Sequence, residues 1–356
     1  MSKKHSVFLQ FLFITLLIII FSGCRSIVIE KEVDSYMATR GKNNSFNGSI
    51  LIAQGDKVLV SKGYGMANYE HEVYNNSNTK FRIGSITKQF TAMAILILQE
   101  KGILNISDNI DQYIPNCPES WNEITIHHLL THSSGIPNFT SFPEYTEIMT
   151  KKHSLLQIMS IFMNRSLEFT PGNAFSYSNS GYIVLGHIIE KVSNMKYDDF
   201  LSEHIFEKIG MVNTGYDHNE EIIKNRASGY THGGLKNADY IHMSIPHAAG
   251  ALYTIVEDLY LWDRSLYTEK IVKKESITSM FTPHIGFYGY GWEIYESKSI
   301  SKRVEHGGGI NGFSSYIRRY IDDDLVLIIL SNDEGQCFSV LPDITHIVKK
   351  YLQNQP

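Results

Sequence analysis

The sequence predicts a mixed α/β fold in which strands from both ends of the chain form one antiparallel sheet, flanked by helices, with a mostly helical lobe inserted. Three observations lead to this class. Residues 47–63 hold two β-rich runs, residues 85–268 have mostly helical patterns and long polar loops, and strand patterns return at residues 289–332. The 356 residues are 43% hydrophobic, which is enough for one large core or two closely packed lobes.

The first elements are a helix and a hairpin. A helical pattern covers residues 30–40, and the runs "NGSILIAQ" and "KVLVSKG" follow it. Gly55 and Asp56 join the two runs, and this pair is a strong signal for a tight hairpin turn. We therefore expect two antiparallel strands near the start of the folded domain.

The last elements are four strands and a helix. The strings "GYGWEIY", "RVEHGG", "GFSSYIRRY" and "LVLIILSN" are typical of successive strands, with Asp322, Asp323 and Asp324 in an acidic turn. A final helix is expected around residues 341–352. The prediction is a single domain over residues 24–356. Its sheet lobe comprises about 24–84 and 272–356, and its helical lobe comprises about 85–271.

The first 23 residues have the pattern of an export signal. Lys3 and Lys4 precede an apolar run from Val7 to Phe21, and "SGC" then ends at Cys24. The run is shorter than the roughly 20 residues of a spanning helix, which favours cleavage over an uncleaved anchor. The small residues before Cys24 resemble a bacterial lipoprotein processing box. We therefore expect a lipid on Cys24 and attachment to the extracytoplasmic face of the cell membrane.

Charge and cysteine content narrow the partners. Without Lys3 and Lys4 the formal charge moves from −5 to −7, and no basic run favours nucleic acid. A small molecule or the cell wall is the expected partner, with no cofactor and a monomeric chain. Cys117 and Cys337 are either a disulfide or two inert thiols, and the lack of a dense cysteine framework favours thiols.

Four S-x-x-K strings begin at Ser77, Ser85, Ser193 and Ser299. Only the string at Ser85 leads into an apolar run, "TAMAILILQ", so only Lys88 is expected to be buried. Residues three apart share a helix face, and a buried amine loses its proton more readily and can activate a serine. An isolated match fits an N-cap serine beside a snorkelling lysine better, so the rest of the chain must decide.

Two later strings could complete such a site. In "PGNAFSYSNSGY", Tyr177 could relay protons near Lys88, and the Asn179 amide could hold Lys88 and a substrate carbonyl. The alternative is that Tyr177 lies in an ordinary turn and only packs its ring against the protein. In "EHGGGINGF", consecutive glycines after His306 weaken a strand, which indicates that another group approaches the backbone closely. A bulged sheet edge is the alternative there.

These three strings, in this order, resemble the serine β-lactamase and DD-peptidase-like superfamily, most of all its class C β-lactamase and D-aminopeptidase/esterase branch. The connecting text is similar as well, including "FRIGSITKQF", "ITIHHLLTHSSGIP" and "AAGALYTIVEDLYLW". The resemblance implies a β-lactamase/transpeptidase-like fold. It also implies that Ser85 is the nucleophile, Lys88 its activating partner and Tyr177 the proton relay to the leaving group.

The resemblance further implies a substrate-binding set of Asn179, His306, Gly308 and Gly309, with the Ser85 and Gly309 backbone N–H groups as the oxyanion hole. His306 stands where many relatives have the lysine of K-T-G. An unperturbed histidine titrates near ~6.5, so we expect His306 to hold a substrate carboxylate only while protonated and to lose that contact as pH rises from about 6 to 8.

The expected function is an exported serine hydrolase that is acylated at Ser85 by D-amino-acid peptides or esters of the cell envelope, as in D-alanyl carboxypeptidases and penicillin-binding proteins. Alternatives are a broad carboxylesterase, a weak class C-like β-lactamase and a penicillin-binding sensor without turnover. The sequence contains no G-x-S-x-G elbow and no H-E-x-x-H motif. His128 and His132 are four apart but lack a third ligand nearby, so no metal site is expected.

Overall fold

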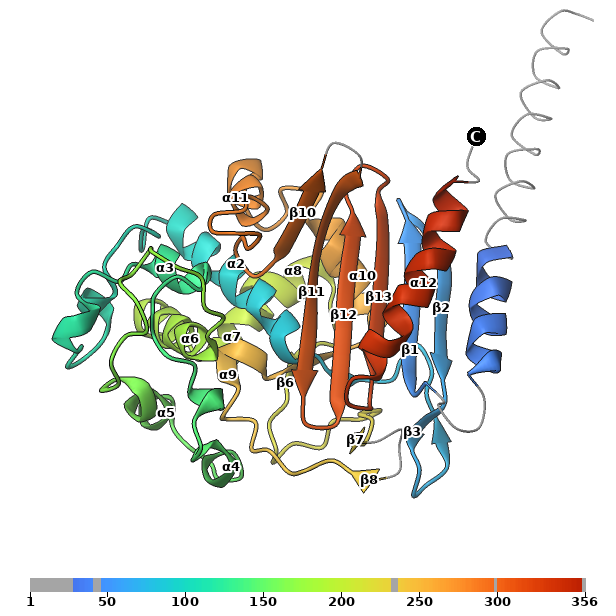
Figure 1. Cartoon of the computed structure of the whole chain (residues 1–356), viewed down its shortest axis with the longest axis horizontal. Helices are drawn as coiled ribbons and strands as arrows, with labels where there is room; N and C mark the ends of the chain where they lie inside the picture. Colours follow the sequence, from blue (N-terminus) through green and yellow to red (C-terminus); the bar gives the residue numbers. More distant parts are fainter. Residues whose placement is uncertain (1–27, 41–45, 232–235, 298–299, 354–356) are drawn as a thin grey trace, which may run out of the picture.

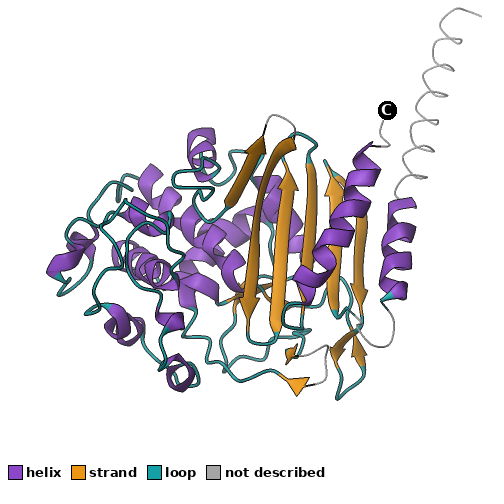
Figure 2. Ribbon diagram, viewed as in Figure 1, coloured by secondary structure: helices purple, strands orange, loops and turns teal. Residues whose placement is uncertain are grey.

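The computed structural model describes residues 28–40, 46–231, 236–297 and 300–353. The expected signal peptide and Cys24 lie outside these residues. A central sheet has helices on both faces, and a larger group of helices lies beyond its β10 edge (Figures 1 and 2). The fold is thus the mixed α/β arrangement that the sequence predicts.

The sheet has six antiparallel strands in the order β10-β11-β12-β13-β1-β2. The strands are β1 (Gly48–Gln54), β2 (Lys57–Tyr64), β10 (Glu293–Ser297), β11 (Ile300–Ile310), β12 (Phe313–Tyr320) and β13 (Leu325–Ser331). The two chain ends meet where β1 pairs with β13, with Ile50 opposite Ile329. Every residue of β13 is buried, because helices cover both faces of the sheet, and its sequence is accordingly an almost continuous apolar run. The prediction of one sheet from both ends is confirmed.

Helices from both ends of the chain cover one face of this sheet. Residues 28–39 form a helix that contributes Ile29 and Val33 to a core with β1 and β13. The last helix, α12 (Gln336–Gln353), contributes Cys337 and Ile344 to the same core. It begins five residues before the expected start, and Pro342 lies inside it. An interior proline loses one helix hydrogen bond, and the burial of the apolar face of α12 offsets that cost.

The opposite face packs against α10 (Val256–Ser265), and the helical lobe continues from there. The lobe also contains α2 (Thr87–Glu100), α3 (Ile126–Leu130), α4 (Tyr145–Ile148), α5 (Leu155–Phe162), α6 (Asn179–Ser193), α7 (Tyr197–Leu201), α8 (Glu207–Ile209), α9 (His247–Gly250) and α11 (Lys274–Met280). The short strands of this lobe were not predicted, because a strand of two or three residues shows no periodicity. An example is the small sheet β5 (Phe81–Arg82), β9 (Leu252–Thr254) and β6 (Gly215–Tyr216).

Helix α2 is the centre of the lobe. All of its residues from Thr87 to Leu98 are buried, and it packs against α6 and α9. A helix that is apolar on every side must be enclosed by protein, so the first turn of α2 carries Lys88 into the interior. No helix within the described ranges is both long enough and apolar enough to span a membrane.

Candidate active site

Ser85 lies in a short 3-10 turn, Gly84–Ile86, directly before α2. Gly84 has a φ of +49°, and a Cβ on it would lie 2.8 Å from the Gly309 backbone nitrogen. Only glycine combines this left-handed conformation with so close an approach. The turn therefore sets Ser85 against the end of strand β11.

Lys88 has three polar neighbours from three different elements. Its Nζ lies 3.0 Å from Ser85 Oγ, 2.8 Å from Asn179 Oδ1 and 2.8 Å from the Ala249 carbonyl oxygen. The side chain is fully buried, and burial lowers the pKa of Lys88 well below its usual value. Within the described residues, no carboxylate forms an ion pair with it.

The hydrogen-bond inventory of Lys88 suits a neutral amine. The Asn179 and Ala249 carbonyl oxygens can only accept, so they take the two N–H bonds of an uncharged amine. In its uncharged form the amine has a lone pair that can accept the Ser85 hydroxyl proton over the 3.0 Å between the two atoms. The Asn179 Nδ2 group donates in turn to Thr140 Oγ1 at 3.1 Å, which holds the amide in this orientation. This is the geometry of a serine activated by a lysine base.

Tyr177 lies beside this pair as a neutral phenol. Its ring centroid is 4.9 Å from Lys88 Nζ, and burial raises the pKa of Tyr177 above 10. The neighbouring Ser85 side chain opposes this rise in the pKa of Tyr177. It does not form a hydrogen bond with the phenol, because the buried phenol oxygen has no partner among the residues described. A group that stays protonated suits proton delivery to a leaving group better than proton abstraction, so the base role falls to Lys88.

The expected titration of His306 is wrong. The side chain is 2% exposed, and burial, with a smaller contribution from Lys88, lowers the pKa of His306 to about 3. Its Nδ1 donates to the Gly307 carbonyl oxygen at 2.6 Å, and its Nε2 accepts from the Tyr288 hydroxyl at 2.9 Å. Both ring nitrogens are therefore occupied, and the imidazole is neutral at physiological pH. It does not act as a cationic anchor for a carboxylate.

The glycines of β11 have different surroundings. A Cβ on Gly308 would lie 2.1 Å from the Ile83 carbonyl oxygen, so this glycine admits the Ser85 segment against the strand. Gly308 does not line the pocket that contains Ser85, and its expected substrate contact stays a prediction. Gly309 has open space beside it and lines the pocket that contains Ser85. A close backbone approach was predicted from the glycine run, and the approaching group is the protein's own chain.

A pocket of about 160 Å³ opens above Ser85. Phe139, Tyr145 and Ile241 supply its apolar walls, and Asn179 and Asn311 supply polar groups. No Lys, Arg, Asp or Glu side chain of the described ranges lines it. The pocket therefore favours an uncharged acyl group and offers no charged partner to a free carboxylate.

Three contributions were not found from the sequence. The Ala249 carbonyl reaches Lys88 through the backbone of α9, which no side-chain pattern can reveal. Tyr288 occupies His306 Nε2, and His132 Nδ1 accepts from the Ser178 backbone N–H at 3.2 Å. The His132 ring also lies 4.2 Å from the ring of Tyr177, so it supports the tyrosine loop.

His128 closes a capping box with Thr125 at the start of α3. Cys117 and Cys337 are free thiols, as favoured.

The fold and the Ser85–Lys88 pair define an active-serine hydrolase of the serine–lysine type. The chain belongs to the Beta-lactamase family, whose match covers residues 30–350. The enzyme is therefore a serine hydrolase of the serine β-lactamase and DD-peptidase-like superfamily.

Relatives and solved structures agree with this assignment. A penicillin-binding protein of Bacillus subtilis is 32% identical over 328 residues, covering 85% of this chain and 72% of the relative. The crystal structure of a penicillin binding protein from Bacillus halodurans is similar with a TM-score of 0.77 and 25% identity, covering 85% of this chain and 97% of that one. A D-amino acid amidase from Ochrobactrum anthropi SV3 shares the fold, with a TM-score of 0.79 and 23% identity over 93% and 99% of the chains.

Proposed function

We propose that this enzyme forms an acyl-enzyme at Ser85 with D-amino-acid amides, esters or peptides of the cell envelope and transfers the acyl group to water. The observation that carries this proposal is the buried Lys88 at 3.0 Å from Ser85 Oγ, with its pKa lowered well below its usual value by burial. A neutral amine at this distance can take the hydroxyl proton as Ser85 attacks a carbonyl carbon.

The reaction follows from the positions of the groups. As Ser85 Oγ bonds to the substrate carbon, negative charge develops on the carbonyl oxygen. The backbone N–H groups of Ser85 and Gly309 are our candidates to bind that oxygen, since both residues line the pocket. Protonated Lys88 then passes its proton through Tyr177 to the leaving group, and the acyl-enzyme remains. Water, activated by the same groups in reverse, releases the product.

The substrate class follows from the lining of the pocket, where the described residues contribute no Lys, Arg, Asp or Glu side chain. The pocket favours an uncharged acyl group, and His306 is neutral, so a carboxylate next to the scissile bond gains little from either. Amides and esters therefore suit this site better than peptides with a free terminal carboxylate or β-lactams. The names of the relatives, penicillin-binding protein and D-amino acid amidase, are compatible with this class. Broad carboxylesterase activity is the second candidate, because a small apolar pocket also suits simple esters.

The proposed setting is the outer face of the cell membrane, with the enzyme attached through a lipid on Cys24. Only the sequence supports this part of the proposal, through Lys3, Lys4, the apolar run and the small residues before Cys24. An extracytoplasmic hydrolase of this class would meet D-amino-acid substrates in the cell wall.

The decisive experiment compares turnover of four substrates by the same preparation: a D-amino-acid amide, a D-Ala-D-Ala peptide, a p-nitrophenyl ester and a chromogenic cephalosporin. Intact-mass spectrometry with each substrate measures the acyl-enzyme. We expect the highest kcat/KM for the amide or the ester. Turnover of the ester alone would favour the carboxylesterase, and a stable cephalosporin adduct without turnover would favour a sensor.

A further inference from the structure

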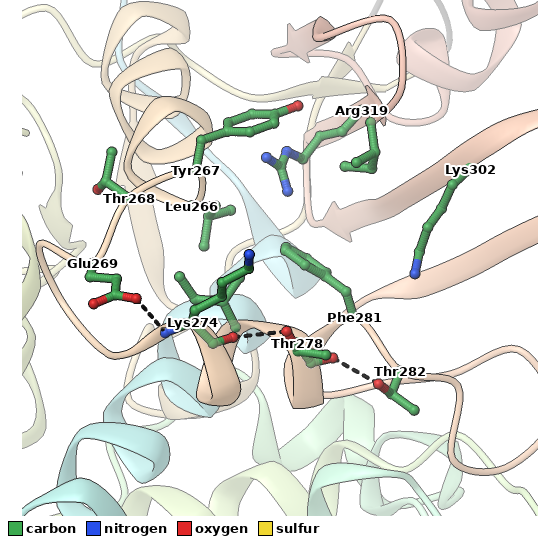
Figure 3. Close-up of a pocket in the computed structure, with 12 residues that line it drawn as sticks. Leu266, Tyr267, Thr268, Glu269, Lys274, Thr278, Phe281, Thr282, Lys302 and Arg319 are labelled. Carbon is green, nitrogen blue, oxygen red and sulfur yellow. Dashed lines mark hydrogen bonds between the residues drawn. The ribbon is translucent and has the colours of Figure 1, made fainter.

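A second pocket lies at the other end of strand β11, between the residues that follow α10 and helix α11 (Figure 3). Its volume is about 490 Å³, within the range of small-molecule sites. Lys302 of this pocket and Gly309 of the catalytic pocket are seven residues apart on one strand. At about 3.3 Å per residue they are roughly 23 Å apart, so the second pocket is a separate site.

The floor of this pocket contains a buried arginine with an unsatisfied donor. Arg319 is 1% exposed, and its Nε donates to Asp263 Oδ1. The guanidinium carbon lies 4.7 Å from the Tyr267 ring centroid and 5.1 Å from that of Phe281. Its buried Nη1 has no hydrogen-bond partner in the described part of the chain. Buried N–H donors are nearly always paired, so this nitrogen indicates where an acceptor oxygen would be stabilised.

Two lysines also line the pocket, and one of them, Lys302, is ion-paired with Glu296 at 3.9 Å. Figure 3 shows Lys274 and Arg319 projecting toward one another beneath Tyr267, while Lys302 points to the far side of Phe281. Lys274 forms no ion pair with a carboxylate of the described ranges. One acidic residue, Glu269, lines the pocket, and its Oε1 accepts from the backbone nitrogen of Lys274. Because Arg319 is already ion-paired with the buried Asp263, a ligand carboxylate would find its charge partner in Lys274 and a hydrogen-bond donor in Arg319 Nη1.

Leu266, Ile277, Phe281 and Ile321 supply apolar lining, and Thr268, Thr278 and Thr282 add hydroxyl groups. Aliphatic and aromatic side chains beside a charged cluster match a ligand with an anionic head and a hydrocarbon tail. We propose that this pocket binds a small anionic amphiphile, with its carboxylate between Lys274 and Arg319 and its alkyl chain along Leu266 and Ile277. Tyr267, which is 42% exposed, forms the outer wall of the pocket.

Calorimetric titration of the full chain with octanoate tests this proposal. Loss of one charge-assisted contact costs on the order of tenfold in affinity, so Lys274→Gln should weaken binding about tenfold. Lys270→Gln is the matched control, because Lys270 is an exposed lysine nearby that does not line this pocket. Ser85→Ala should bind octanoate as the unaltered chain does, which separates this site from the catalytic pocket.

Two further measurements test charge and shape. Octylammonium has the same tail and the opposite charge, and it should bind at least tenfold more weakly than octanoate. Ile277→Trp should abolish octanoate binding by filling the pocket, while esterase turnover at Ser85 is retained. The proposal is refuted if octanoate does not bind, if Lys274→Gln and Lys270→Gln bind it equally, or if octylammonium binds as tightly. Each of these results leaves the proposed reaction at Ser85 unaffected.

Discussion

Replacing Asn179 by aspartate tests whether Lys88 works as a neutral base. The two side chains have the same shape, so Asn179→Asp puts a carboxylate oxygen where the amide oxygen now lies, 2.8 Å from Lys88 Nζ. The Thr140 hydroxyl, which now accepts from Asn179 at 3.1 Å, can turn and donate to the new carboxylate. The substitution therefore changes charge with little change in packing.

The size of the effect follows from that distance. At an effective dielectric constant of about 20, two unit charges 2.8 Å apart attract each other by about 6 kcal/mol. Measured pKa shifts from adjacent opposite charges are smaller, roughly 1 to 3 units, because desolvation opposes the attraction. We expect the pKa of Lys88 to rise by that amount. At a pH below both the original and the raised pKa, kcat/KM should then fall about 10- to 1000-fold, since only the uncharged amine accepts the Ser85 proton.

The assay is kcat/KM for a p-nitrophenyl ester between about pH 5 and 10. In Asn179→Asp the rise of activity with pH should move to higher pH, and activity should return as Lys88 loses its proton. Asn311→Asp is the matched control, because Asn311 lines the same pocket and its Nδ2 donates to the Asp239 carbonyl oxygen, away from Lys88. If both variants have the same pH profile, Lys88 is not the titrating base and the reasoning fails.

Three other predictions concern the nucleophile, His306 and the N-terminus. Ser85→Ala should lose all labelling by a fluorophosphonate probe, whereas Ser77→Ala should keep it; the reverse pattern would show that the wrong serine was chosen. The folded-state pKa of His306, about 3, lies below the unfolded value near 6.5, so its stabilisation is complete above pH 6.5 and is lost as pH falls toward 3. At pH 5 the loss is about 2 kcal/mol, and urea unfolding of His306→Gln should show a smaller difference between pH 7 and 5; an equal difference would contradict the assignment. Cys24→Ala should release the protein from the membrane fraction or leave the precursor uncut, and a mature N-terminus mapped elsewhere would exclude lipidation at Cys24.

The sheet was predictable from the sequence because its signals are local. Gly55 and Asp56 select a tight turn, and Gly55 has a φ of +54° in the structure. The apolar run of β13 indicates burial on both faces. The start of α12 was missed, because Pro342 is a stop signal in the sequence and only the packing of the helix on the sheet overrides it.

The sequence by itself also distinguished Ser85 from three other S-x-x-K serines, since only its lysine enters an apolar helix that must be buried. It could not determine the charge state of His306. Sequence assigns a histidine its unperturbed pKa, whereas burial, with a smaller contribution from Lys88, lowers the pKa of this one to about 3. The contact of the Ala249 carbonyl with Lys88, and an Arg319 Nη1 without a partner among the described residues, could not be foreseen either. Proton affinity and hydrogen-bond satisfaction depend on which atoms surround a group, and residues far apart in the chain supply those atoms only when it folds.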